Sequence, residues 1–329
     1  MKIAVLAGGI SPEREVSLCS GKMIAAALTS RGHSVALLDP SKESPVLREQ
    51  FFRTYDEIEK NSPVFDKSPP PENGVSITES VLELLKAAQR VFLALHGGDG
   101  ENGNIQALLG ALGIVYNGSP PSACAVAMDK ILTKKLFAAS GILTPEYTVY
   151  LKGQRTPPLP PRYPCVVKPA NGGSSVGVSF VMRPFGLEEA VEKALGQCER
   201  VLLESAVFGR ELTVGVLRDK PLAVTEINPK NGFYDYNNKY IFGRTEEITP
   251  APLSDELTAR AMRIALKAHQ AVGMRNFSRT DFILEQETGL LYALEINALP
   301  GMTATSLLPQ AAKYRGIDYA SLCEQMLEV

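Results

Sequence analysis

The chain has 329 residues, of which 45% are hydrophobic and 21% are charged, and its formal net charge is −2. This composition excludes a disordered chain, and the length predicts two or three domains. The near balance of charge argues against a nucleic-acid or anionic-membrane partner, and no apolar run approaches the roughly 20 residues of a membrane helix. Five scattered cysteines without metal-ligand spacing indicate a reduced, cytoplasmic enzyme.

The first third of the chain predicts a parallel, Rossmann-like α/β unit. An apolar strand at residues 3–7 leads into two glycines, and a helix then runs from Ser11 to Gly32. A second strand at residues 35–38 completes a βαβ arrangement. The remaining elements expected here are an irregular loop at 61–74, a helix at 81–88, a strand at 91–95, a helix at 105–112 and a strand at 114–116.

Two further units follow a boundary at Asn117–Pro121, where turn-forming residues cluster. The elements expected in them are a helix at 123–139, an irregular proline-rich segment at 153–164, a strand at 165–168, a helix at 187–194, and strands at 200–203 and 211–217. The sequence therefore predicts three α/β units, which we place at residues 1–118, 119–208 and 209–329.

The loop at residues 171–177 combines three glycines with the hydroxyl groups of Ser174 and Ser175. Glycines let backbone N–H groups approach an anion closely, and hydroxyls add donors. Lys168 on the preceding strand would supply a positive charge to the same anion. A flexible turn is the simpler interpretation of the loop taken alone, and it is not a Walker loop, because the G-x-x-x-x-G-K-[ST] order is absent.

A predicted hairpin near the C-terminus brings two carboxylates and an amide together. The alternating strand at residues 277–284 places Arg279 and Asp281 on one face. Since opposed positions in a hairpin have a constant sum, Asp281 lies roughly opposite Glu295, and Asn297 shares that face. Such oxygen ligands suit Mg²⁺. The alternative is a solvated face on which Arg279 neutralises the acids, but the apolar flanks indicate burial and favour a metal site.

Two more segments are candidates for ligand binding. Ser306 can cap a helix that begins at Leu307, and a helix N-terminus beside a glycine loop offers backbone donors to an anion; a plain capped helix is the alternative. His96 opens a glycine-rich loop at a strand end, where parallel sheets bind their ligands. His33 and His269 lack such a context, and we interpret both as structural.

With these segments in view, the sequence resembles the D-alanine–D-alanine ligases of the ATP-grasp superfamily over nearly its whole length. The matching motifs, in family order, are Gly8–Leu18, His96-Gly97, Met128–Lys130, Val167–Pro169, Gly173–Gly177, Phe233–Tyr236, Lys239-Tyr240, Arg279 with Asp281, and Glu295–Thr303. The resemblance implies a three-domain ATP-grasp architecture, in which an N-terminal parallel-sheet domain joins two α+β domains that sandwich ATP. It also implies the ligation of two D-alanine molecules to D-alanyl-D-alanine through D-alanyl phosphate, for peptidoglycan precursor synthesis.

The resemblance assigns a role to individual residues. ATP would be contacted by Lys130, Lys168, Ser174, Ser175, Glu204, Ala206, Val207, Glu211 and Lys239. Two Mg²⁺ or Mn²⁺ ions would be held by Asp281, Glu295 and Asn297. The two D-alanine molecules would be contacted by Glu13, His96, Arg279, Gly301, Ser306 and Leu307. The catalytic set would be Glu13, Ser174, Tyr240, Arg279 and Gly301. Within that set, Glu13, Ser174 and Tyr240 would form a hydrogen-bonded triad that closes the site. Arg279 and the Gly301 N–H would stabilise the oxyanion. We also expect a homodimer.

The sequence departs from the family pattern at three places. The usual E-D-G reads Glu101-Asn102-Gly103, the usual Q-G-x-L-E reads Gln106–Gly110, and Ser278 replaces a common glycine. The first two adjoin the first-substrate loop, so a ligase that joins D-alanine to D-lactate or D-serine is the nearest alternative. A dinucleotide-dependent oxidoreductase is more remote, because the G-x-G-x-x-G spacing is absent. An inactive ATP-binding regulator would have lost residues such as Arg279 or Glu295.

Overall fold

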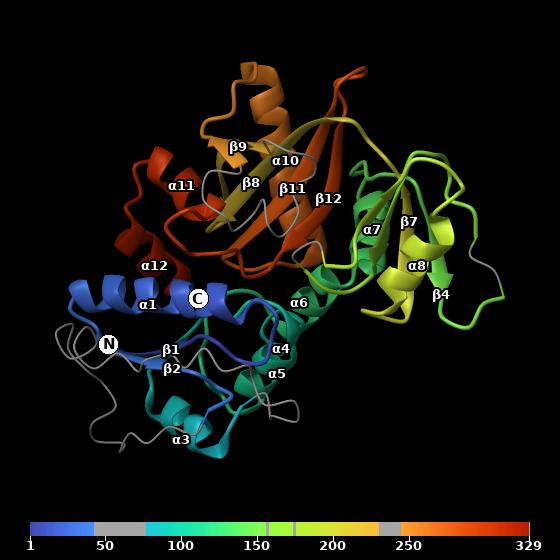
Figure 1. Ribbon diagram of the computed structural model, residues 1–329. Helices are drawn as coiled ribbons and strands as arrows, with labels where there is room; N and C mark the ends of the chain where they lie inside the picture. The colour runs from blue at the N-terminus through green and yellow to red at the C-terminus, as the bar shows by residue number, and fades with distance from the viewer. Residues whose placement is uncertain (43–76, 156–157, 174–175, 230–244, 329) are drawn as a thin grey trace.

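The computed structural model describes residues 1–42, 77–155, 158–173, 176–229 and 245–328. These residues form three β-sheets on which the helices pack (Figure 1). The N-terminal sheet is parallel, and the other two are antiparallel. The predicted α/β fold with a parallel N-terminal sheet is therefore confirmed. The loop expected at residues 61–74 lies outside the described residues.

The N-terminal sheet has the strand order β2-β1-β3. Its strands are β1 (Lys2–Leu6), β2 (Ser34–Leu38) and β3 (Arg90–Leu93). Residues 3–6 are fully buried, as expected for the central strand of a parallel sheet. The helix α1 (Arg14–Ser30) packs so closely that a Cβ added to its Gly21 would lie 2.3 Å from the Cβ of Ala7. Glycine at position 21 therefore permits the close approach that sets α1 against the sheet.

The other helices of this part are α3 (Glu79–Ala87), α4 (Gly98–Glu101) and α5 (Asn104–Ala111). The loop predicted after His96 thus contains the single-turn helix α4. The strand predicted at residues 114–116 is wrong, since only one bridge forms there, between Val91 and Tyr116. The physical reason is Asn117, whose Oδ1 accepts the Leu93 N–H at 2.6 Å, a donor that a longer strand would have used.

The C-terminal sheet has the strand order β10-β9-β8-β11-β12. Its strands are β8 (Gly209–Leu217), β9 (Lys220–Pro229), β10 (Thr245–Ile248), β11 (Phe277–Glu285) and β12 (Leu291–Asn297). Three helices, α6 (Pro121–Met128), α7 (Lys130–Ala139) and α10 (Asp255–Val272), share a core with one face of this sheet. The helix α11 (Leu307–Tyr314) packs against the sheet at β8 and β9.

The single helix predicted at residues 123–139 is wrong, because the chain forms two helices there. They are α6 (Pro121–Met128) and α7 (Lys130–Ala139). Asp129 lies between them in an extended conformation, and its carboxylate accepts the N–H groups of Ile131 and Leu132, both at 3.0 Å. Lys130 is therefore the first residue of a helix and not a mid-helix residue.

The central sheet has the strand order β4-β7-β5-β6 and a core of its own. Its strands are β4 (Tyr147–Leu151), β5 (Cys165–Pro169), β6 (Ser179–Val181) and β7 (Arg200–Ser205). The helix α8 (Leu187–Leu195) packs on it (Figure 1). The strand predicted to stop at Glu204 continues one residue further in β7, since Ser205 pairs with Cys165 of β5.

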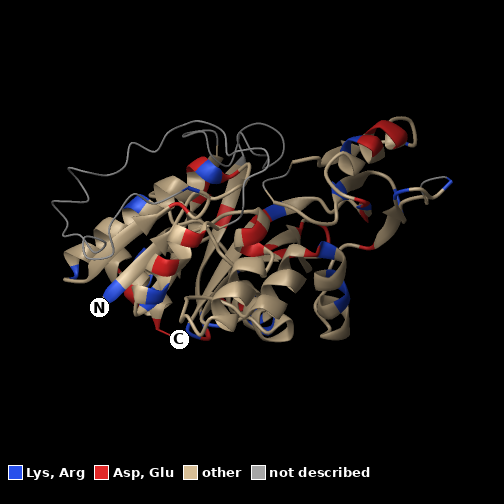
Figure 2. Cartoon of the chain, turned by 90° about the horizontal axis from the view of Figure 1, so that it is seen from below, with Lys and Arg blue, Asp and Glu red and all other residues tan. Residues whose placement is uncertain are grey.

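The N-terminal and C-terminal parts are joined by a common core and by α12 (Tyr319–Leu327), which lies beside α1 (Figure 1). Phe277 and Leu299 are buried in this core together with the strands of the N-terminal sheet. Lysine and arginine positions are interspersed with aspartate and glutamate positions along the chain (Figure 2). Among the residues that the structure describes, no helix combines the length and apolar character that a bilayer crossing requires.

Candidate functional site

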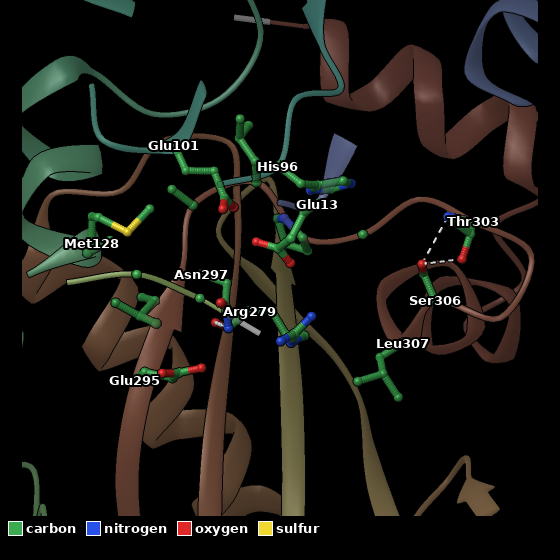
Figure 3. Close-up of a pocket in the computed structure, with 18 of the residues that line it drawn as sticks. Glu13, His96, Glu101, Met128, Arg279, Glu295, Asn297, Thr303, Ser306 and Leu307 are labelled. Carbon is green, nitrogen blue, oxygen red and sulfur yellow. Dashed lines mark hydrogen bonds between the residues drawn. The ribbon is translucent and has the colours of Figure 1, made fainter. Parts of the chain in front are cut away.

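A polar pocket lies where loops of the N-terminal part meet the C-terminal hairpin and the glycine loop of the central sheet (Figure 3). The predicted residues that line it are Glu13, His96, Lys130, Arg279, Glu295, Asn297, Gly301, Ser306 and Leu307. They come from segments that are far apart in the sequence. The fold therefore brings together most of the residues that the motifs had marked for substrate and metal binding.

The strands β11 and β12 supply the charged centre of the pocket. Asp281 is paired directly with Glu295, and Arg279 with Asn297, so the predicted hairpin register is confirmed. A bulge follows immediately, because Phe282 pairs with Ala293 and the register shifts there. The bulge lies next to the acidic pair, a place where such irregularities often redirect side chains.

The Asp281 carboxylate is hydrogen-bonded by three side chains. It accepts both Arg279 Nε and Nη2 at 2.9 Å, Asn297 Nδ2 at 3.0 Å and the hydroxyl of Thr213 at 2.6 Å. Arg279 thus neutralises the aspartate, as the alternative interpretation of the hairpin expected. The oxygen donors of Asp281, Glu295 and Asn297 still lie together on one face and fit a hard divalent cation. No group of three or more His, Cys, Asp or Glu with metal-binding geometry occurs among the described residues.

Lys130 connects the hairpin to the glycine loop. Its Nζ donates to the Gly172 carbonyl at 2.7 Å and lies 3.4 Å from Glu295 Oε2. The loop continues toward the N-terminal part, because a Cβ added to Gly173 would lie 3.1 Å from Glu13 Oε2. The backbone of the loop therefore reaches the carboxylate of Glu13 in the pocket.

Four of the predicted site residues lie outside the described residues. They are Ser174, Ser175, Lys239 and Tyr240. The expected triad of Glu13, Ser174 and Tyr240 therefore stays a prediction.

His96 lines the pocket and is buried. Its Nε2 is 3.2 Å from the hydroxyl of Ser20 on α1. Burial lowers the pKa of His96 below its ordinary value, although the nearby Glu13 opposes this effect. The imidazole is therefore neutral at pH 7 and can both donate and accept a hydrogen bond.

Glu101 is a pocket residue to which the sequence analysis assigned no role. Its Oε2 accepts the Gly97 N–H at 2.7 Å. Burial of the carboxyl, together with the negative charge of Glu13, raises the pKa of Glu101 to about 8. The signal that could have identified it is its place in the same glycine-rich loop as His96.

Ser306 precedes α11 as predicted, but its side chain does not cap that helix. Its Oγ instead accepts the Thr303 N–H at 2.9 Å and hydrogen-bonds the Thr303 hydroxyl at 2.8 Å (Figure 3). A Cβ added to Gly301 would lie 2.8 Å from the Ser306 Oγ, so the close turn requires glycine at this position. The prediction of a helix N-terminus beside a glycine loop is confirmed, while the predicted capping bond is wrong.

A second group of predicted residues does not line this pocket and lies on the central sheet, after its strand β7 and on β8. Lys168 is on β5 and Glu204 is on β7, and the Lys168 Nζ is 2.9 Å from Glu204 Oε1. Ala206 and Val207 follow β7, and Glu211 begins the pairing of β8 with β9. These residues border the connection between the central and C-terminal sheets.

Glu204 is also paired with a lysine that the sequence analysis did not identify. Lys134 of α7 is buried, and its Nζ lies 3.0 Å from the same carboxylate oxygen. Burial alone would raise the pKa of Glu204, but the two ammonium groups hold it below its ordinary value. The only available signal was helical spacing, since Lys134 stands four residues after Lys130.

Comparison with known proteins identifies the family. Family profiles described as "D-ala D-ala ligase N-terminus" and "D-ala D-ala ligase C-terminus" match residues 2–119 and 146–328. The chain belongs to the D-alanine–D-alanine ligase family. The D-alanine–D-alanine ligase of Syntrophotalea carbinolica is 40% identical to it over 326 residues, which cover 99% of this chain and 95% of that protein. The D-alanine–D-alanine ligase of Pediococcus pentosaceus is 39% identical, with coverage of 99% and 97%.

Solved structures of the D-alanine–D-alanine ligase family share this fold. The D-alanine–D-alanine ligase of Bacillus anthracis complexed with ATP superposes with a TM-score of 0.77 and 26% identity, over 100% of this chain and 96% of that chain. A second structure of the Bacillus anthracis ligase gives a TM-score of 0.76 at 29% identity, with the same coverage. The resemblance inferred from the motifs and the expected ATP-grasp architecture are both confirmed.

Proposed function

We propose that this protein is an ATP-dependent carboxylate–amine ligase that joins two D-alanine molecules to D-alanyl-D-alanine and releases ADP and phosphate, for peptidoglycan precursor synthesis. The observation that carries the proposal is the cluster of Arg279, Asp281 and Glu295. It adjoins a pocket that Glu13 and Ser306 line from opposite sides, in a chain of this ligase family.

ATP is proposed to bind between the central and C-terminal sheets. Its phosphates would be contacted by Lys130, Lys168 and Lys239 and covered by Ser174 and Ser175, and its base and ribose by Glu204, Ala206, Val207 and Glu211. The position of Lys130 supports this, because its ammonium already lies beside the glycine loop and Glu295.

Mg²⁺ or Mn²⁺, as two ions, is proposed to be held by Asp281, Glu295 and Asn297. The direct pairing of the two acids and the all-oxygen donor set support this assignment. When bound, the metal would neutralise phosphate charge.

The first step is proposed to be attack by a carboxylate oxygen of the first D-alanine on the γ-phosphorus of ATP. The bond to the β,γ-bridging oxygen breaks, and ADP leaves with D-alanyl phosphate as the product. Glu13, with the neutral His96 nearby, would bind the ammonium group of this substrate. Such a transfer depends on positioning and charge neutralisation, which the lysines supply.

In the second step the amine of the second D-alanine attacks the acyl carbon and loses a proton, and the C–O bond to phosphate breaks. Arg279 and the N–H of Gly301 would stabilise the tetrahedral oxyanion. Ser306 and Leu307, at the N-terminus of α11, would hold the carboxylate of this substrate. Closure through Glu13, Ser174 and Tyr240 would exclude water, which otherwise hydrolyses the acyl phosphate.

We further propose that the chain divides into units at residues 1–118, 119–208 and 209–329, acts as a homodimer and works in the cytoplasm. The three sheets support this division, although α6 and α7 pack on the sheet of the third unit.

The test is to incubate the purified protein with ATP, with and without Mg²⁺, and with a panel of D-amino and D-hydroxy acids. Mass spectrometry should detect D-alanyl-D-alanine and ADP, in equal amounts and only with the metal. D-Alanyl-D-lactate or D-alanyl-D-serine as the main product would establish the alternative ligase. Absence of any ligated product would refute the proposal.

A further inference from the structure

Glu204 lies between two lysines that approach the same oxygen atom. The Nζ atoms of Lys134 and Lys168 are 3.0 and 2.9 Å from Glu204 Oε1. The three residues come from α7, β5 and β7. Since one carboxylate neutralises one ammonium group, the cluster carries one surplus positive charge in the protein interior.

The two lysines have different surroundings. The Lys134 side chain is 0% exposed, whereas that of Lys168 is 10% exposed. The Lys134 Nζ donates to the Thr144 hydroxyl at 2.6 Å and lies 5.4 Å from the ring centre of Tyr147. Lys134 is therefore fixed on several sides. Among the described residues, Glu204 is the polar partner that the structure shows for the Lys168 ammonium.

We infer that Lys134 is a positioning residue of the nucleotide site: it is the permanent counterion of Glu204, and it thereby allows Lys168 to pair with a phosphate of ATP. The inference rests on the proposed function, because it takes Lys168 as a phosphate contact. Without Lys134, transfer of Lys168 to a phosphate would leave a buried carboxylate unpaired, which is strongly unfavourable. ATP would then have to compete with Glu204 for Lys168.

The charge states of the cluster agree with this role. Burial lowers the pKa of Lys134 to about 8, with Glu204 and Glu295 opposing the shift and Lys168 adding to it. Glu204 stays ionised because both lysines hold its pKa below the ordinary value against the effect of burial. At pH 7 the buried pair of Lys134 and Glu204 is thus charged on both sides and internally neutral.

The first test replaces Lys134 and measures ATP binding by titration calorimetry in the absence of D-alanine. We expect K134M to raise the Kd for Mg–ATP about tenfold, which corresponds to ~1.4 kcal/mol, while kcat at saturating ATP changes much less. The matched control is K135M, which removes an exposed lysine from the next position of the same helix. A folded K134M variant that binds ATP as tightly as K135M would overturn the inference.

A second comparison separates a charge effect from a packing effect. In the E204Q background no carboxylate retains Lys168, so K134M should change the Kd for ATP by less than about twofold. An equal loss of affinity in both backgrounds would mean that Lys134 acts through packing, and the inference would be wrong.

A third experiment uses the wild-type protein, so its outcome does not depend on whether a variant folds. In a crystal structure with a non-hydrolysable ATP analogue, we expect the Lys134 Nζ to keep its ion pair with Glu204 and the Lys168 Nζ to contact a phosphate oxygen. Retention of Lys168 on Glu204, or departure of Lys134 from it, would contradict the inference. All these readouts use ATP binding alone, so a failed ligation assay and a failed inference can be told apart.

Discussion

Glu204 on the central sheet is buried and Glu101 in the N-terminal part is half-buried, and the two glutamates differ in their electrostatic surroundings. Glu204 contacts two ammonium groups, and its pKa lies below the ordinary value despite burial. Glu101 accepts a backbone N–H and faces the negative charge of Glu13, and its pKa is raised. Burial acts to raise the pKa of both carboxyl groups, and only at Glu204 do neighbouring cations outweigh it.

The different charge states of Glu204 and Glu101 suit their proposed surroundings, the ATP site and the site of the first D-alanine. The ionised Glu204 balances the buried Lys134 beside Lys168, the lysine that would contact a phosphate of ATP. A Glu101 that keeps its proton avoids a second negative charge beside Glu13, which would bind the ammonium group of the first substrate. The same residue type thus contributes a charge at one site and a neutral hydrogen-bonding group at the other.

The largest expected change in stability follows from removing the negative charge of Glu204. The E204Q substitution leaves Lys134 and Lys168 buried next to each other without a counterion, so we expect the free energy of unfolding at pH 7 to fall by about 3 kcal/mol. Urea denaturation measures this change. The matched control is E192Q on the exposed face of α8, for which a change within about 0.5 kcal/mol is expected. Equal stability of both variants would show that the lysines do not depend on Glu204.

An intermediate effect is expected at Asp281. This buried carboxylate pairs with Arg279 and also accepts a hydrogen bond from the uncharged hydroxyl of Thr213. The T213V substitution removes the 2.6 Å hydrogen bond to Asp281, and we expect it to lower the free energy of unfolding by about 1.5 kcal/mol. Because the substitution also removes one of the groups that orient the Asp281 carboxylate, the Mg²⁺ concentration needed for half-maximal phosphate release should rise.

The control for this variant is T225V. Thr225 pairs with Thr213 across β8 and β9 and bonds the neutral hydroxyl of Thr249. We expect T225V to lose stability without a change in the Mg²⁺ requirement. The same shift in that requirement for both variants would rule out a specific role of Thr213 at Asp281.

A different kind of effect, a pH dependence, is expected at Glu101. Since its pKa is higher in the folded than in the unfolded chain, the folded state binds the extra proton between about pH 4.5 and 8, and the associated stability is lost as the pH rises through this range. E101Q, which carries no proton to lose, should show a smaller fall in the free energy of unfolding between pH 5 and 8. Parallel curves for the wild-type protein and E101Q would mean that Glu101 is ionised throughout.

Local patterns in the sequence predicted part of this site. The alternation of β11 and the short turn after it were sufficient to place Asp281 opposite Glu295. The bulge beyond that pair could not be predicted, because side-chain alternation does not report an extra residue until the partner strand is known. Likewise, the capping of α7 by Asp129 interrupts an apolar pattern that looks continuous along the chain.

The features of the site that the sequence did not predict depend on residues that are far apart in the chain. Lys134 and Glu204 are 70 positions apart, on a helix of one core and a strand of another, and no spacing rule connects them. Glu101 was visible in its loop, but its raised pKa depends on burial in the folded chain and on Glu13, which approaches from a different segment. Charge balance among distant residues is a property of the folded chain.

The proposed function requires that a D-alanine carboxylate attacks the γ-phosphate of ATP. D-Alanine labelled with ¹⁸O in its carboxylate, incubated with the protein, ATP and Mg²⁺, tests it directly by mass spectrometry of the released phosphate. We expect one ¹⁸O atom per phosphate formed, because the C–O bond of D-alanyl phosphate breaks in the second step. Phosphate that carries oxygen from solvent water alone would show that ATP is hydrolysed without an acyl phosphate, and it would contradict the proposed function.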